Sequence, residues 1–308
     1  MDNLTHSLIG FTMAKAGLEK KCGKGTVAAL VIASSLPDID FLYAIPQPDQ
    51  AWMYRRMLTH SLVGMPLLAL LAAFVFSKFS PNISYWKRFG LYFLGIVVHV
   101  FFDAVNSYGV VFLYPFVMTR YELSWVFVVD LFIWAILLYP FGAWIAKWPE
   151  SSVEPAARAA LVLVGIYVAV CGYGSVQTSR LIDERMEEEG RSPEYRYAFP
   201  EVLGGHRFRG IVREGDIYST YLVNWIDGSI LPGDTFVSML SDPAVERFWE
   251  TEDGENIAWF FEAPVFRVAA DKSMIEVNDL RFKSIVMSYH RNPFEYTYPY
   301  PEAKDYAE

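Results

Sequence analysis

The chain has 308 residues, of which 53% are apolar and only 20% charged, and its formal net charge is −9. Residues 1–178 contain 12 Lys and Arg against 10 Asp and Glu, whereas residues 179–308 contain 14 against 25. An apolar, weakly charged first part followed by an acidic second part excludes a single soluble domain and a disordered chain. It also excludes a general nucleic-acid-binding protein, which needs a basic face.

The N-terminus and the two cysteines suggest no processing or disulfide chemistry. Residues 1–6 lack the basic and apolar regions of a cleavable signal peptide, so we expect no such signal. Cys22 and Cys171 are too few for a disulfide framework or a cysteine-based zinc site, and we expect them to be free thiols.

Residues 1–178 contain five apolar stretches of about the 20 residues that a membrane span requires. These stretches are residues 26–45, 61–79, 89–105, 125–146 and 159–176. A shorter and more polar stretch, residues 3–18, predicts one further helix. The pattern therefore predicts a mainly α fold, a multi-pass helical membrane bundle of five or six helices.

Lys and Arg are distributed unevenly between the segments that connect these helices. Nine of them fall on one side of the predicted bundle, and three, Arg55, Arg56 and Arg120, fall on the other. Because basic residues favour the cytoplasmic side of a membrane, we expect the part after the last span to be extracytoplasmic.

Residues 179–308 have the pattern of a small acidic domain that is α+β or β-rich. Residues 180–191 predict a charged helix and residues 243–250 a short one. The expected strands are residues 206–213, 217–226, 257–269 and 280–289. Asp227-Gly228 predicts a hairpin turn, and we expect the tail, residues 296–308, to be loosely held.

Polar residues inside the apolar segments are the candidates for chemistry. They are His6, His60, His99, Asp38, Asp40, Asp103 and Asp130. A charged side chain at the centre of a span costs about 2.5–3.5 kcal/mol. A bound divalent cation would compensate several such carboxylates at once.

The spacing of these residues supports one shared metal site. His99 and Asp103 are four residues apart and lie on one face of a helix. Asp38 and Asp40 follow Pro37, where the second segment must end or unwind. In the expected orientation every candidate except Asp130 lies near the outer face of the membrane. Asp130 is expected inside its span, either as a ligand or as a supporting group.

Imidazole and carboxylate ligands without cysteine fit zinc best, with manganese or iron as alternatives. The number of candidates would also permit a two-metal centre with a bridging Asp. Simpler interpretations remain open at this level. A lone histidine is often a buried core residue, and the two Thr-His-Ser-Leu repeats, residues 5–8 and 59–62, are compatible with helix N-caps.

Four motifs together resemble the YdjM-like family of inner-membrane-associated metal-dependent hydrolases. They are residues 2–8 (DNLTHSL), 36–40 (LPDID), 56–62 (RMLTHSL) and 99–109 (HVFFDAVNSYG), and residues 208–218 (FRGIVREGDIY) resemble the longer members. The resemblance implies a multi-pass membrane protein with a His/Asp metal centre and a distant relation to zinc-dependent phospholipases C. His6, Asp38, His60, His99 and Asp103 match the motif positions, and Asp40 matches as a ligand or a supporting residue.

The leading hypothesis is a hydrolase of the inner membrane that cleaves a lipid-like phosphoester with metal-activated water. Asp40 or Asp130 would act as the base or orienting group. The expected partners are the lipid bilayer and a lipid or phosphoester substrate, without nucleic acid. Arg55 and Arg56 would bind a lipid phosphate or anchor the chain at the interface.

Two non-enzymatic alternatives compete with this hypothesis. In a metal or proton transporter the polar residues should continue toward the cytoplasmic side, but here they stop near one face. A purely structural anchor that displays the C-terminal domain leaves the buried carboxylates unexplained, and a non-enzymatic membrane protein with a structural metal stays open.

Overall fold

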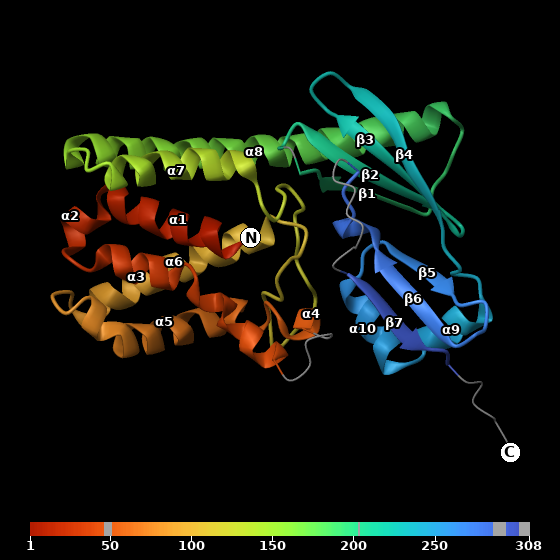
Figure 1. Ribbon diagram of the computed structural model, residues 1–308, viewed down its shortest axis with the longest axis horizontal. Coiled ribbons are helices and arrows are strands. Elements are labelled where there is room, and N and C mark those ends of the chain that lie inside the picture. Colours follow the sequence, from red (N-terminus) through yellow and green to blue (C-terminus); the bar gives the residue numbers. More distant parts are fainter. Residues whose placement is uncertain (46–50, 203, 286–293, 302–308) are drawn as a thin grey trace, which may run out of the picture. The chain divides into compact units, whose positions relative to one another are not determined.

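The computed structural model describes residues 1–45, 51–202, 204–285 and 294–301. The chain is mainly helical, and its C-terminal part is built around β-sheets, as predicted (Figure 1). It divides into two compact units, Met1–Gly172 with Leu203–Gly205, and Tyr173–Val202 with His206–Glu308. The expected domain boundary after residue 178 lies inside one continuous helix, α8 (Glu150–Glu188), which belongs to both units.

The first unit consists of α-helices joined by shorter helical turns. In chain order these are α1 (Asn3–Met13), η1 (Ala14–Leu18), α2 (Glu19–Cys22), α3 (Thr26–Ala33), η2 (Leu36–Ala44), α4 (Ala51–Tyr54), η4 (Leu58–His60), α5 (Gly64–Val75), η5 (Phe76–Phe79), α6 (Tyr85–Ala104), α7 (Leu131–Ile145) and the first part of α8.

Helix α1 is the central helix of this unit. Every residue from Leu8 to Met13 is buried, and a helix that is buried on all faces occupies the interior of its bundle. It packs against α3, α6 and α7 (Figure 1). His6 lies on this helix and is therefore carried into the interior of the unit.

Two glycines allow α3 to pass close to both α1 and α6. A Cβ atom on Gly10 of α1 would lie 2.5 Å from the carbonyl oxygen of Leu30, and one on Gly95 of α6 would lie 2.5 Å from the Cβ of Ala33. Any larger residue would push the helices apart. The close packing fixes α1 and α6 on either side of the C-terminal end of α3.

The structure confirms only part of the predicted membrane bundle. Among the described residues, α8 is long and apolar enough to cross a membrane, and a bent pair, Trp52–His60 with Gly64–Phe79, passes the same test if it counts as one span. Helices α1, α3, α5 and α7 have 11, 8, 12 and 15 residues, fewer than a straight span needs. Helix α6 has 20 residues, but charged side chains lower its hydropathy.

Two of the expected apolar segments change conformation where their carboxylates lie. The helix expected at residues 26–45 ends at Ala33, and η2 follows as a 3₁₀ turn that contains Asp38 and Asp40, which agrees with the predicted unwinding at Pro37. The helix expected at residues 125–146 begins only at Leu131, because the side chain of Asp130 caps it. The expectation that Asp130 lies inside the span was wrong.

The second unit contains the C-terminal part of α8 and two antiparallel sheets. Their strand orders are β1-β2-β3-β4 and β5-β6-β7. The elements are β1 (Tyr195–Pro200), β2 (Arg207–Glu214), β3 (Ile217–Asn224), β4 (Ser229–Val237), α9 (Pro243–Trp249), α10 (Glu252–Phe260), β5 (Pro264–Val268), β6 (Met274–Asp279), η6 (Leu280–Phe282) and β7 (Glu295–Pro299).

Local turn signals predicted the β2–β3 hairpin and the turn after β3 correctly, whereas strands β1 and β4 were not among the expected strands. Strands β2 and β3 and helix α9 lie where they were expected, and Gly215 and Gly228 adopt φ values of 56° and 72° in the connecting turns. These are left-handed values that glycine adopts without strain.

The later strand predictions were wrong. Residues 252–260 form α10, because the Thr251 side chain accepts a hydrogen bond from the Gly254 N–H and caps the helix, so only Pro264–Val268 is a strand there. Residues 280–282 form the turn η6, and residues 286–289 lie outside the described residues. Strand β7 occupies part of the tail that was expected to be loosely held.

Substituting Gly10 by Ala tests the close contact between α1 and α3. We expect Gly10→Ala to destabilise the protein by about 1–3 kcal/mol, because the new methyl group meets backbone that cannot move aside. Gly165→Ala in α8 is the matched control, since its Cβ would meet nothing within 4 Å. Thermal unfolding in detergent should show a lowered midpoint for Gly10→Ala and an unchanged or raised one for the control. Equal midpoints would contradict the assigned packing.

Candidate metal centre

Helix α6 supplies two of the four side chains at the centre of the site. His99 and Asp103 are one turn apart on its buried face, and Nε2 of His99 lies 3.3 Å from Oδ2 of Asp103. The i, i+4 spacing seen in the sequence therefore does bring the imidazole and the carboxylate together.

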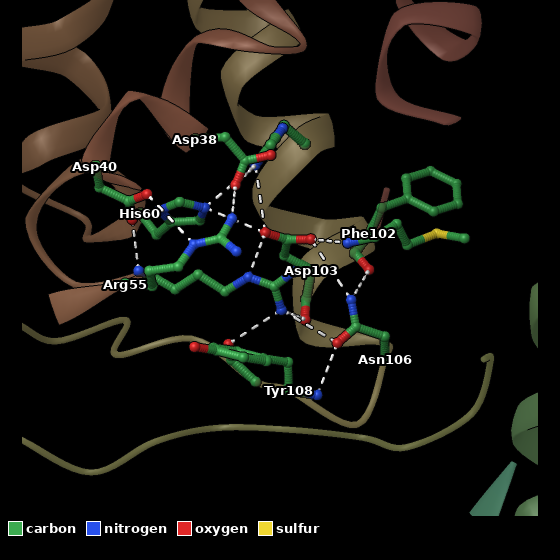
Figure 2. Close-up of polar contacts among 12 residues, drawn as sticks. Asp38, Asp40, Arg55, His60, Phe102, Asp103, Asn106 and Tyr108 are labelled. Carbon is green, nitrogen blue, oxygen red and sulfur yellow. Dashed lines mark hydrogen bonds and ion pairs between the residues drawn. The ribbon is translucent and has the colours of Figure 1, made fainter. Parts of the chain in front are cut away.

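Two short 3₁₀ turns supply the other two side chains. Nε2 of His60, in η4, lies 3.2 Å from both His99 Nε2 and Asp103 Oδ2. Oδ1 of Asp38, in η2, lies 4.0 Å from His99 Nε2. One possible ligand atom from each of these four buried residues lies within 4.8 Å of all the others. Figure 2 shows Asp38, His60 and Asp103 converging from separate segments of the chain.

His6 reaches the same cluster from helix α1. Its Nε2 lies 3.2 Å from Oδ1 of Asp103, and its ring stacks on that of His99 with centroids 3.7 Å apart. The N-terminal amine of Met1 also pairs with Oδ1 of Asp103. All five residues that the sequence proposes as ligands thus lie in one buried cluster, with Asp103 contacted by three of the others.

Groups behind the imidazoles fix which nitrogen faces the cluster. Nδ1 of His99 lies 2.7 Å from the carbonyl oxygen of Ser34. Because a carbonyl only accepts, Nδ1 carries the proton and Nε2 presents a lone pair to the cluster. On the other ring, Nδ1 of His60 lies 2.9 Å from Oγ1 of Thr59 and 3.5 Å from Oδ2 of Asp40.

Asp40 therefore lies behind His60 and outside the central group of four. Its Oδ2 accepts a hydrogen bond of 2.6 Å from the backbone N–H of Arg56. A carboxylate that contacts the far nitrogen of a histidine orients the ring and increases its basicity. Of the roles considered for Asp40, the geometry favours the orienting one.

Arg55 and Arg56 are neighbours in sequence but differ in their surroundings. Nε of Arg56 forms an ion pair of 2.8 Å with Asp103 Oδ2, and its guanidinium lies 4.5 Å from the centroid of the Tyr108 ring. Arg56 is buried and has φ of 61°, which is uncommon for a residue other than glycine. Arg55 donates a hydrogen bond of 2.9 Å from Nη2 to Asp38 Oδ1, and its side chain is 33% exposed.

The residues present fit a divalent cation. Oδ2 of Asp38 and Nδ1 of His6 are buried polar atoms without a hydrogen-bond partner among the described residues. An unpaired buried carboxylate oxygen is costly. A cluster of carboxylates and imidazoles without thiolates is a ligand set suited to zinc, manganese or iron.

Several residues around the cluster were not predicted. Asn106 accepts a hydrogen bond of 3.1 Å from Arg56, and Tyr108 lies beneath the guanidinium groups of Arg55, Arg56 and Arg120. Asn106 lies three residues after Asp103, and this helical spacing is a signal that could have revealed it. Tyr108 carries no such signal, because its partners come from other segments.

Asp130 takes part in a different network. Its side chain accepts hydrogen bonds from the N–H groups of Phe132 and Ile133 and, at 2.8 Å, from the hydroxyl of Tyr167. Within the described part of the chain it makes no hydrogen bond or ion pair with the His/Asp cluster. The structure therefore does not bring Asp130 to the site.

A buried His/Asp cluster within a unit of helices defines a protein with a candidate metal centre. The chain belongs to the YdjM inner membrane protein family, whose model matches residues 1–178. This confirms the resemblance seen in the motifs, and every residue of the cluster lies in the matched range.

The chain is also similar along most of its length to a bacterial protein. It is 22% identical over 302 residues to the uncharacterized protein YfhP of Bacillus subtilis (strain 168), a match that covers 92% of this chain and 88% of that protein. No solved structure matches the chain significantly.

The different surroundings of Asp40 and Asp130 lead to opposite expectations for the same substitution. Asp40→Asn should weaken zinc binding by about 10- to 100-fold, because His60 loses the carboxylate that orients it. Asp130→Asn should leave zinc affinity unchanged, because Asp130 makes no contact with the cluster among the described residues, and should change stability little, since Asn caps a helix about as well as Asp. Competition with a chromophoric chelator measures the affinity, and thermal unfolding measures the stability. Equal zinc affinities for the two variants would remove Asp40 from the site.

Proposed function

We propose that the protein is a multi-pass inner-membrane hydrolase that binds a divalent cation, preferably zinc, and cleaves a phosphoester of a lipid-like substrate. The observation that carries this proposal is the buried group of Asp38, His60, His99 and Asp103, with possible ligand atoms within 4.8 Å of one another. The unpartnered Oδ2 of Asp38 supports a cation as the missing partner.

These four residues would hold the cation, with His6 contacting the other oxygen of Asp103. A divalent cation in such a site supplies a Lewis acid and lowers the pKa of a bound water. The chain's own groups hold the ligands in place. The Ser34 carbonyl fixes the tautomer of His99, Asp40 orients His60, and Arg56 pairs with Asp103.

Large exposed apolar residues support a membrane location for the first unit. They include Leu67, Leu71 and Phe74 on α5, Leu131, Phe132 and Leu138 on α7, and Val162, Leu163 and Ile166 on α8. Soluble monomers rarely expose apolar side chains on this scale. Short helices also follow one another along the chain, since α1, η1 and α2 run from Asn3 to Cys22 with a kink at Gly17, whose φ is 121°. We therefore propose five or six membrane-crossing segments.

The distribution of basic residues supports an extracytoplasmic C-terminal unit. The three that oppose the positive-inside pattern, Arg55, Arg56 and Arg120, all lie within 6.0 Å of the Tyr108 ring centroid. Their place at the site explains why they occur on the less basic side. These three arginines are therefore no evidence against the membrane orientation that the other nine basic residues favour.

Metal analysis of single and double variants tests the metal centre. His99→Ala and Asp103→Ala should each abolish zinc binding, and the double variant should lose little more than either single one, because both act through one ion. Zinc per chain is measured by mass spectrometry of detergent-purified protein. His206→Ala, in the second unit, is the control and should keep the wild-type zinc content. If His99→Ala contained as much zinc per chain as the wild type, His99 would merely pack in the bundle and would not bind the metal.

The same preparations distinguish hydrolysis from transport. We expect zinc-loaded protein to release phosphate or a phosphorylated headgroup from phospholipid vesicles, and His99→Ala to be inactive. Zinc or proton flux into proteoliposomes without phosphoester cleavage would favour the transporter instead.

A reporter fusion tests the orientation. Alkaline phosphatase fused after Gly190, just beyond α8, should be active, because it folds outside the cytoplasm, and green fluorescent protein at the same point should be dark. The opposite pattern would place the C-terminal unit in the cytoplasm.

A further inference from the structure

The ionic groups around the cluster are balanced before any cation binds. Three carboxylates, those of Asp38, Asp40 and Asp103, are buried there. Three guanidinium groups lie over the Tyr108 ring nearby, at 4.5, 5.3 and 6.0 Å from its centroid. A divalent cation would leave this largely buried set with excess positive charge, which is costly unless an anion joins it.

The arginines differ in what they can offer to an anion. Arg56 is enclosed by the cluster, because it pairs with Asp103 and donates to Asn106, and its side chain is only 4% exposed. Arg55 contacts Asp38 through Nη2, its buried Nε has no hydrogen-bond partner among the described residues, and its side chain is 33% exposed. Arg55 therefore differs from Arg56 in its solvent access, which lets the exposed part of its guanidinium meet an anion that approaches the cluster.

Arg55 is also held in place beside the cluster. Its backbone carbonyl accepts a hydrogen bond of 3.4 Å from Nη2 of Arg120, and its Nε lies 3.9 Å from Oδ1 of Asp40. Figure 2 shows the Arg55 side chain between Asp38 and Asp40. A planar guanidinium held in this way can bind two oxygens of one phosphate.

We propose that Arg55 binds the non-bridging oxygens of a phosphoryl group at the edge of the metal centre, and that it thereby selects phosphoesters as substrates. The inference rests on the proposed function, since the cation would supply the charge that makes an anion favourable. Arg56, in contrast, has a supporting role in holding Asp103. The phosphoryl group can belong to a lipid headgroup or to a soluble phosphate, because both offer the same oxygens.

Calorimetric titration of zinc-loaded, detergent-purified full chain tests the role of Arg55. The probes are inorganic phosphate and vesicles of phosphatidylcholine with and without phosphatidic acid. Arg55→Gln should weaken binding of the probe by at least about tenfold, the loss expected for one charge-assisted contact, and Arg55→Lys should fall between it and wild type. Zinc content should not fall, because the substitution removes a cation that competes for Asp38. Arg180→Gln, at an exposed arginine paired with Glu184, is the matched control and should behave as wild type.

The outcomes separate this inference from the proposed function. Wild-type protein that holds no zinc overturns the proposed function and this inference with it. Wild-type protein that holds zinc but binds neither probe overturns the inference alone. The same holds if Arg55→Gln binds phosphate as wild type does, or if it loses its zinc, since Arg55 would then only position Asp38. Weakened binding of inorganic phosphate supports a soluble source, and weakened binding confined to phosphatidic acid vesicles supports a lipid headgroup.

Discussion

The buried carboxylate of Asp103 is the group on which the rest of the site depends. Its partners are the Met1 amine, His6, His60, His99 and Arg56. A carboxylate with no exposed surface is stable only when opposite charges and donors surround it. The segments that supply these partners are distant in sequence, so satisfying this one charge ties together the N-terminus, helix α1, the turn at Arg56, the 3₁₀ turn η4 and helix α6.

The helical packing of the first unit brings the residues around Asp103 together. Gly10 and Gly95 let α3 lie close to its neighbours, and the carbonyl of Ser34 beyond α3 then contacts the far side of His99. The two 3₁₀ turns also bring side chains to the site. At η2 and η4 the backbone leaves the α-helical path, and Asp38 and His60 therefore point toward the cluster. Backbone that leaves the helical path gives up helical hydrogen bonds and is tolerated where the protein interior supplies other partners, which agrees with its place around a buried polar cluster.

The backbone conformation at Arg56 gives two neighbouring arginines, Arg55 and Arg56, different burial and different contacts. The left-handed φ of Arg56 directs its backbone N–H to Asp40, and its side chain enters the interior toward Asp103. Arg55, one residue earlier, stays partly exposed on Asp38. Residues in sparsely populated backbone regions persist where surrounding contacts hold them, and they concentrate at functional sites.

The sequence by itself determined the helical first part, the β2–β3 hairpin with the turn after it, and the five His and Asp residues of the cluster. It could do so because helical spacing, turn residues and carboxylates in apolar segments are local signals. The lengths of the helices, the cap at Asp130 and the strand β7 needed the structure, since capping and strand pairing depend on partners elsewhere in the chain. The placement of Asp40 behind His60, the burial of Arg56 and the gathering of three arginines on Tyr108 were likewise decided only by tertiary structure. Contacts between segments far apart in sequence leave no periodic pattern in either one, so no single stretch of residues could have revealed them.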